Sequence, residues 1–235
     1  DGAAALFNQA VVAQRRGNVD KALELLAAAS AKDPHLAVAH GLTAEILHHN
    51  GRTGWEGASE RAIGMQKDQS QGWNARAASA IEKKDWNAAM VASRTALIGN
   101  AETLNAYQNL ARAYYEQGQY QMARLVCEEA LKIDENSGSM HNLLGLIHIK
   151  LDNVRAALRA FTKAVEGDPT STESHLNLAA TVLNYADFEQ SKKHFDAAIG
   201  LESGNQDALL GRAVAARGLN DFKQARADYD TLFKA

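Results

Sequence analysis

The chain has 235 residues, of which 46% are hydrophobic and 23% are charged, and its formal net charge is −3. Basic and acidic residues alternate without a block of like charge, which argues against a surface that follows nucleic-acid phosphates. Apolar runs fall short of the roughly 20 residues that cross a bilayer, and the single Cys127 excludes an internal disulfide framework. Abundant alanine and sparse β-branched residues favour helices over strands.

Small residues recur through the chain at a nearly constant interval. Seven of them are spaced by 33 or 34 positions: Ala10, Ala44, Ala77, Ala111, Gly145, Ala179 and Ala213. A second series follows 12 positions after six of these: Ala22, Ala89, Ala123, Ala157, Ser191 and Ala225. Two series that keep the same phase over this length indicate an internal repeat.

The residue pattern of each repeat predicts two helices joined by a turn. Turns such as "RRGNVD" and "EQGQYQ" place Gly17 and Gly118 where a helix end needs a left-handed residue. Between repeats, polar stretches such as "EGDPTS" stop the second helix. Small residues allow two helices to approach closely, and a large neighbour such as Phe161 fills the space beside Ala157 and Ala164. Since one helix pair cannot bury its apolar face, each repeat depends on its neighbours.

These residues resemble the tetratricopeptide repeat family, whose 34-residue pattern is W-x2-L-G-x2-Y, then A-x3-F, then P. Leu144, Gly145, Ala157, Phe161 and Pro169 carry this pattern most fully. The resemblance implies an all-α protein, a right-handed α-solenoid that forms a single domain over residues 1–235. Its seven repeats are expected at about residues 3–36, 37–69, 70–103, 104–137, 138–171, 172–205 and 206–235.

The stretch "EILHHNGRTGWEG", residues 45–57, departs from the repeat and at first suggests a metal or catalytic loop. Aligning Trp55 with the aromatic residues of the other turns brings Ala58 into the second series of small residues and gives this turn two extra residues. Glu45 and His49 share a helix face but His48 does not, and zinc needs three or four ligands. We therefore expect no metal site and interpret both histidines as solvated residues at a helix end.

The remaining reactive side chains occupy positions of the repeat pattern. His40, His141 and His175 take the place of the family's tryptophan and His148 that of its tyrosine, which predicts packing groups. Cys127 takes the place of the phenylalanine, which predicts a small buried hydrophobic residue instead of a nucleophile. No catalytic or cofactor motif stands apart from the repeat, so we expect a protein that is not an enzyme and uses no cofactor.

In this family the first helices of successive repeats line a concave groove. The resemblance assigns these residues to the groove: Asn74, Gln108, Asn109, Arg112, Tyr115, Asn142, Leu146, Ile149, Leu176, Asn177, Leu183, Leu210, Val214 and Arg217. Some members hold the C-terminal carboxylate of chaperone tails with a lysine, asparagine and arginine set. Phe7 and Val11 stand in two of those places here and Arg112 lacks a flanking lysine, so that ligand is not expected.

Two features of the predicted groove remain open to two interpretations each. The amides of Asn74, Asn109, Asn142 and Asn177 either hold the backbone of an extended peptide or are simply solvated. The apolar stripe of Leu146, Ile149, Leu176, Leu183, Leu210 and Val214 is either an interface or is covered by a terminal helix or by neighbouring inner-face side chains.

The predicted function is a non-catalytic scaffold that binds a peptide or helix of a partner protein in this groove and organises a multiprotein assembly. One alternative is a recruitment or regulatory module of a larger enzyme. Another is a self-associating assembly factor, because the end "ADYDTLFKA" falls within the last expected helix and lacks a capping helix.

A partial resemblance bears on the compartment. Residues 175–199 are similar to repeat proteins of bacterial envelope and surface-motility assemblies, which favours the periplasm or cell envelope over the cytoplasm. The start "DGAAALFN" lacks an initiator methionine, which is consistent with a signal or lipid anchor that has been removed.

Overall fold

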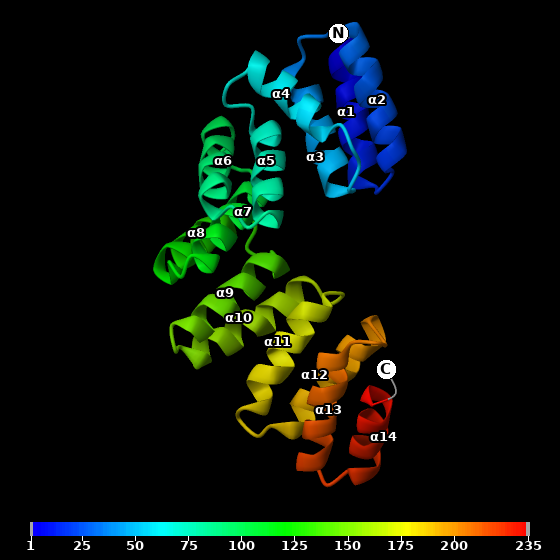
Figure 1. Cartoon of the computed structure of the whole chain (residues 1–235), viewed down its shortest axis with the longest axis vertical. Coiled ribbons are helices and arrows are strands. Elements are labelled where there is room, and N and C mark those ends of the chain that lie inside the picture. Colours follow the sequence, from blue (N-terminus) through cyan, green and yellow to red (C-terminus); the bar gives the residue numbers. More distant parts are fainter. Residues whose placement is uncertain (1, 234–235) are drawn as a thin grey trace. The chain divides into compact units, whose positions relative to one another are not determined.

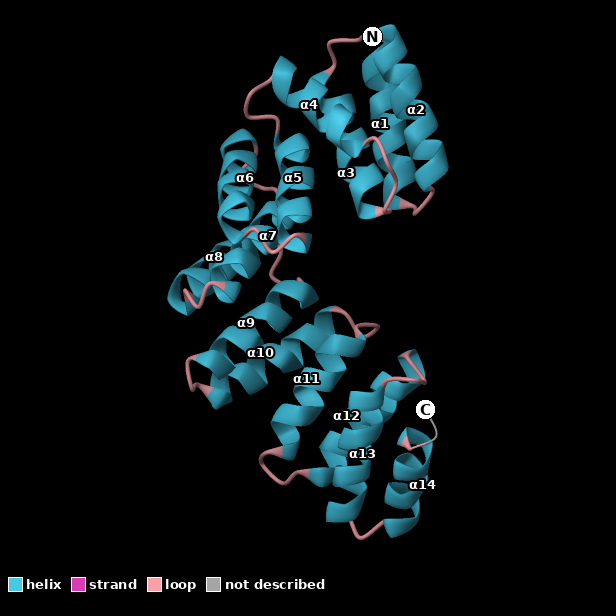
Figure 2. Ribbon diagram, in the orientation of Figure 1, coloured by secondary structure: helices cyan, strands magenta, loops and turns pink. Residues whose placement is uncertain are grey.

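The structure is a computed structural model that describes residues 2–233 and shows only helices and turns in them (Figure 2). The chain divides into an N-terminal unit, Asp1–Met122, and a C-terminal unit, Ala123–Ala235. The expectation of an all-α helical-repeat solenoid is confirmed for these described residues, whereas a single continuous domain over residues 1–235 stays a prediction.

Fourteen helices follow one another in residues 2–233 (Figure 1). The first seven are α1 (Gly2–Arg15), α2 (Val19–Lys32), α3 (Ala37–His49), α4 (Trp55–Met65), α5 (Ser70–Glu82), α6 (Trp86–Gly99) and α7 (Leu104–Glu116). The others are α8 (Tyr120–Ile133), α9 (Gly138–Lys150), α10 (Val154–Gly167), α11 (Thr172–Leu183), α12 (Phe188–Leu201), α13 (Gln206–Gly218) and α14 (Phe222–Leu232). Odd-numbered helices are the first helices of the repeats and even-numbered ones the second helices. Within each unit, a first helix packs against the second helix that follows it, as α5 does against α6.

The turn inside each repeat contains a residue in the left-handed conformation, and the longer second turn has an additional one at Gly54. Gly17 and Gly118, with φ of 73° each, confirm the sequence-based expectation. The same place is taken in the other repeats by Gly51, Lys84, Asp152, Ala186 and Asn220, with φ between 55° and 62°. The left-handed residue is thus a constant of the repeat, even where the side chain has a Cβ that makes this conformation costly.

In five repeats the residue between this turn and the second helix caps the helix. Asn18, Asp85, Asn153, Asp187 and Asp221 each accept a hydrogen bond from the backbone N–H three residues later. Such a cap satisfies one of the free donors at a helix start and contributes about 1 kcal/mol. In these five repeats the turn and the cap together fix where the second helix starts.

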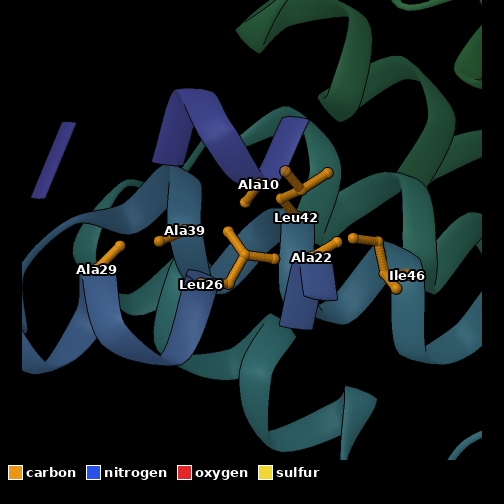
Figure 3. Packing of buried hydrophobic residues seen from close by; sticks show 7 residues of the cluster. All are labelled: Ala10, Ala22, Leu26, Ala29, Ala39, Leu42 and Ile46. Atoms are coloured by element: carbon orange, nitrogen blue, oxygen red, sulfur yellow. The ribbon is translucent and has the colours of Figure 1, made fainter. Parts of the chain in front are cut away.

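The core consists of the small residues predicted from the sequence and of the large side chains between them. All members of both series are buried, most of them completely. Figure 3 shows one such cluster, which α1, α2 and α3 form from Ala10, Ala22, Leu26, Ala29, Ala39, Leu42 and Ile46. In the C-terminal unit a Cβ on Gly145 would overlap the Phe161 ring, and one on Gly211 would overlap Phe195. Small residues therefore mark the places where neighbouring helices touch.

The irregular second repeat keeps the same packing with a longer turn. Gly51 occupies the left-handed position, and α4 begins only after Arg52, Thr53 and Gly54. Ala58 is buried with Ala44 and Ala75, and Trp55 packs against them. The predicted insertion of two residues, and the packing role of Trp55, are both confirmed.

Candidate functional site

In the N-terminal unit, hydrogen bonds link the first helices α3, α5 and α7. Asn109 Nδ2 donates to Asn74 Oδ1 at 2.9 Å, and Asn74 Nδ2 donates to Glu45 Oε1 at 2.9 Å. Asn105 Nδ2 also donates to Glu45 Oε1 at 2.9 Å. Two of the predicted groove residues, Asn74 and Asn109, are therefore joined to a carboxylate and an amide that the sequence-based assignment of the groove did not include.

This network lies in a pocket of about 590 Å³. Its lining, mostly polar and small residues, comes from α1, α2, α3, α5 and α7 and the turns beside them: Gln14, Gly17, Val19, Glu45, Ile46, His48, His49, Asn50, Asn74, Ala75, Ala78, Asn105, Gln108 and Asn109. The predicted groove residues Asn74, Gln108 and Asn109 are thereby brought together in one cavity of the N-terminal unit.

Two further predicted groove residues of α7 contact their own neighbours in sequence. Arg112 is exposed, and its Nε donates to Glu116 Oε1 at 2.6 Å, one helical turn later. Tyr115 is half-buried and its ring packs against Tyr120 with 5.6 Å between centroids. Burial, and then the neighbouring Tyr120 and Glu116, raise the pKa of the Tyr115 phenol, so this residue acts as a neutral aromatic surface with a hydroxyl.

In the C-terminal unit the predicted amides form the same kind of bond. Asn177 Nδ2 on α11 donates to Asn142 Oδ1 on α9 at 2.9 Å. Asn142 is 7% exposed and Asn74, its counterpart in the other unit, is 3% exposed. The interpretation of these two amides as solvated is therefore wrong, because each is covered and bonded to the next first helix. Binding of a peptide backbone by the four amides stays a prediction.

The apolar stripe on the first helices of the C-terminal unit has a buried part and an open part. Leu146 packs against the cluster around Phe161, and Leu176 and Leu183 pack against the cluster around Phe195. By contrast, Ile149, Leu210 and Val214 are 41%, 49% and 38% exposed. Arg217, one turn after Val214 on α13, is exposed. Cover by neighbouring side chains thus describes the first three leucines, whereas the other three present apolar surface to solvent.

Each of the histidines that replace the family's tryptophan makes the same kind of hydrogen bond. The Nε2 atoms of His40, His141 and His175 lie 3.2, 2.8 and 3.1 Å from the backbone carbonyl oxygen six positions earlier. Trp73 makes the equivalent bond through Nε1 to Lys67 at 2.6 Å. A carbonyl can only accept, so each ring donates. These residues are packing groups, as predicted, and histidine fits the place because its N–H can replace that of the indole.

His148 and His194 have pKa values below the ordinary value for histidine. Burial is the largest cause for each, followed by Arg124 for His148 and by His175 for His194. His175 Nδ1 lies 3.1 Å from His194 Nδ1. This contact joins α11 to α12.

The two histidines of the irregular turn have different environments. The side chain of His48 is 9% exposed, meets the edge of Trp55 at 4.9 Å between centroids and lies 3.5 Å from Glu82 Oε2. The expectation of a solvated helix-end residue is therefore wrong for His48, because the lengthened turn folds Trp55 over it. His49 is exposed, as expected. Within residues 2–233, no group of three or more His, Cys, Asp and Glu side chains could hold a metal ion.

Cys127 on α8 is fully buried, which confirms the sequence-based interpretation. Burial, and then the nearby Glu128, raise the pKa of its thiol to about 12. The thiolate, which is the reactive form of cysteine, is therefore scarce at neutral pH.

Sequence reasoning missed an ionic cluster around Arg212 on α13. Arg212 binds both oxygens of Asp228 through Nε at 2.9 Å and Nη2 at 2.6 Å, and its Nη1 donates to Asp196 at 2.8 Å. Asp228 is 2% exposed. The available signal was that Arg212 stands where the three preceding repeats have Leu110, Leu144 and Leu178, with one aspartate 16 positions before it and another 16 after.

Paired helices that repeat every 34 residues, with a cavity and exposed apolar side chains on their first helices, define a helical-repeat protein with surfaces for binding other proteins. Family models described as tetratricopeptide repeat match residues 104–137, residues 138–171 and, as a third model, residues 1–54 together with 185–234. The chain belongs to the tetratricopeptide repeat family. Its repeats make it a protein–protein interaction module, and proteins of this family are typically non-catalytic scaffolds.

Similar proteins agree with this assignment. Tetratricopeptide repeat protein 12 of Mus musculus is 32% identical over 106 residues, which are 44% of this chain and 14% of that protein. The chain thus spans only a small part of that relative.

Solved structures with a similar fold include YrrB, described as a TPR protein with an unusual peptide-binding site. It is 21% identical, with a TM-score of 0.59, over 75% of this chain and 91% of YrrB. The pilF protein of Pseudomonas aeruginosa is 15% identical, with a TM-score of 0.68, over 97% and 88% of the two chains. A chain of the APC/C hetero-tetramer Cut9-Hcn1 is 16% identical, with a TM-score of 0.71, over 97% of this chain and 45% of that one. These likenesses show the fold alone.

The described residues 2–233 contain no helix that is long and apolar enough to cross a membrane.

Proposed function

We propose that the chain is a non-catalytic scaffold whose first helices bind a peptide or helix of a partner protein and thereby organise a multiprotein assembly. The observation that carries this proposal is the exposure of Ile149, Leu210 and Val214 on α9 and α13. Exposed apolar side chains on the first helices of a repeat protein favour contact with another protein, because each methylene removed from water contributes about 0.8 kcal/mol.

The N-terminal unit adds a polar surface to this apolar one. Its pocket presents a carboxylate and several amides on α3, α5 and α7. Amides of this kind donate and accept hydrogen bonds and are suited to a peptide backbone. YrrB, which has the same fold, is described as having a peptide-binding site. Together these observations favour a protein segment over a small molecule as the ligand.

The test is capture of partners from a native lysate with immobilised chain. The variant Ile149→Ser/Leu210→Ser/Val214→Ser removes the exposed apolar side chains of the first helices. Its matched control, Leu125→Ser/Ile133→Ser/Leu201→Ser, removes side chains on α8 and α12 that are 48%, 39% and 45% exposed. We expect the first variant to capture at least about tenfold less partner than the unaltered chain, which corresponds to about 1.4 kcal/mol of binding free energy. The control should capture as much as the unaltered chain. Equal capture by both variants would exclude this surface.

Self-association is a second candidate, favoured by aromatic exposure on α14. Phe222 is 64% exposed and Phe233, at the end of this helix, is 88% exposed. Lys234 and Ala235, which complete the predicted C-terminal contact, lie outside the described residues. Light scattering over a range of concentrations tests this candidate: a mass that rises with concentration and falls on Phe222→Ser supports it, and a constant monomer mass excludes it.

The process served by the scaffold is part of the same proposal. The similarity of residues 175–199 to envelope and surface-motility proteins supports an assembly at the bacterial cell envelope. Fractionation of the native cells, with detection by antibody, tests this assignment. Recovery with the cytosolic fraction alone would exclude it.

A further inference from the structure

Glu45 is the end point of the hydrogen-bond network in the N-terminal pocket. Its Oε1 accepts from Asn74 on α5 and from Asn105 on α7, and Asn109 extends the chain of bonds through Asn74. Three separate helices thus hold this carboxylate at a defined position in a cavity of about 590 Å³. Such fixed geometry is what a specific ligand contact needs, because the protein does not have to reorganise on binding.

The carboxylate also fixes the orientation of the amides. Because Glu45 can only accept, the NH2 groups of Asn74 and Asn105 turn toward it. Asn74 Oδ1 in turn receives Asn109 Nδ2. The atoms left to meet a ligand include three acceptors: Glu45 Oε2, Asn105 Oδ1 and Asn109 Oδ1. The pocket is therefore suited to a ligand with several N–H donors.

The charge of the pocket also favours a ligand of this kind, provided that the ligand is cationic. Glu45 is its one carboxylate, and its lining contains neither lysine nor arginine. Among residues 2–233, no basic side chain lies within ion-pair distance of Glu45. A half-buried carboxylate that has only neutral partners attracts a cation, and this attraction is stronger in a cavity than in bulk water. A free C-terminal carboxylate would be repelled.

We propose that this pocket binds the guanidinium group of an arginine in the partner protein. A guanidinium is cationic, presents five N–H donors in a planar fork and is less strongly hydrated than an ammonium group, which fits a carboxylate flanked by amide oxygens. The cavity has room for an arginine side chain and the adjoining backbone. The inference deepens the proposed function and rests on it for the source of the arginine, since it names one residue of the bound segment.

The test uses two small probes on the unaltered protein. Acetyl-Gly-Arg-Gly-amide carries the guanidinium, and acetyl-Gly-citrulline-Gly-amide replaces it with a neutral group of the same shape. Titration of the isotope-labelled full chain, followed through the side-chain amide NMR signals of Asn74, Asn105 and Asn109, gives the affinity of each. We expect the arginine probe to shift these signals and to bind at least about tenfold more tightly than the citrulline probe, because charge-assisted hydrogen bonds are about twice as strong as neutral ones.

Two variants assign the effect to one carboxylate. Glu45→Gln keeps an oxygen that can accept from Asn74 and Asn105 but removes the charge, and should abolish the preference for arginine. Glu24→Gln removes an equal charge from α2, where the side chain is 69% exposed, and should retain it. Circular dichroism checks that both variants keep their helix content.

Equal affinity for the two probes would overturn the inference, as would an unchanged preference in Glu45→Gln. The comparison of probes on the unaltered chain remains decisive if Glu45→Gln fails to fold. Since neither probe requires the natural partner, this outcome is separate from that of partner capture on α9 and α13.

Discussion

Asn177 donates a side-chain hydrogen bond of 2.9 Å to Asn142, which lies 35 positions earlier in the chain. Asn109 makes the same bond, over the same separation and distance, to Asn74. The two bonds occur in different units, so the relationship belongs to the repeat itself. It joins consecutive first helices and holds their amides in register on the proposed binding face.

A double-mutant cycle should detect this bond directly. We expect Asn142→Ala and Asn177→Ala to show a coupling energy of about 1 kcal/mol in urea unfolding, which is the usual net contribution of a hydrogen bond. Asn184 lies on the same unit at the end of α11 and is exposed. A cycle between Asn142 and Asn184 should therefore be additive. Additivity in the first cycle would mean that the amide pair contributes nothing.

Replacing a left-handed turn residue that has a Cβ by glycine should stabilise the protein. Ala186 has φ of 56°, a conformation that is costly for a residue with a Cβ. We expect Ala186→Gly to raise the free energy of unfolding by about 0.5–1 kcal/mol. The reverse change, Gly118→Ala, should lower it by about 1 kcal/mol, because an added Cβ meets no atom within 4 Å and only the backbone effect remains. Thermal unfolding measures both, and a less stable Ala186→Gly variant would contradict the expectation.

Replacing Arg212 should leave a buried charge without its main partner. In Arg212→Leu, Asp228 keeps only the hydrogen bond from Gln224, and we expect a loss of about 3 kcal/mol in unfolding free energy. The double variant Arg212→Leu/Asp228→Asn should recover most of this loss, because no charge remains buried.

The exposed pair Arg226–Asp230 provides the control for this experiment. Its atoms lie 3.8 Å apart and the Arg226 side chain is 85% exposed, so Arg226→Leu should cost less than about 0.5 kcal/mol. Equal losses for Arg212→Leu and Arg226→Leu would show that the cluster is not a stabilising feature.

Stability should also depend on the protonation of His194. Its folded pKa lies below the ordinary 6.5 because of burial, and then of His175 and Lys193. The unfolded chain therefore binds more protons as the pH falls below 6.5, and the free energy of unfolding decreases until the folded pKa is passed. Urea unfolding between about pH 5 and pH 8 should show this slope, and His194→Gln should reduce it. His148, whose pKa is also lowered, should account for the slope that remains in this variant. An identical pH dependence in His194→Gln would contradict the assignment.

The helical repeat could be predicted from the sequence because close helix packing requires small residues at regular intervals. Ala111 and Gly145 are such residues, and Gly17 takes the left-handed conformation that turns the chain. The left-handed conformation of Lys84 and Ala186 was not predicted, since helix geometry imposes it there against residue preference. Sequence could therefore place these turns but not their strain.

The candidate site was predictable only in part. Periodicity shows which face of a helix a side chain lies on, but not how deeply it is buried, so Leu146 and Leu210 looked alike although only Leu210 is open. The hydrogen bonds between the amides, and those that Asn74 and Asn105 donate to Glu45, depend on the distance between helices that are far apart in sequence. Periodicity does not give that distance. The ionic cluster of Arg212 was missed because its partners, Asp196 and Asp228, come from two other helices.

Hydroxyl-radical footprinting of the chain with and without the captured partner tests directly whether the first helices bind it. We expect oxidation of Ile149, Leu210 and Val214 to fall on binding, while that of Leu125 and Leu201 on the second helices is unchanged. Protection of Leu125 and Leu201 with continued oxidation of Ile149, Leu210 and Val214 would contradict this expectation.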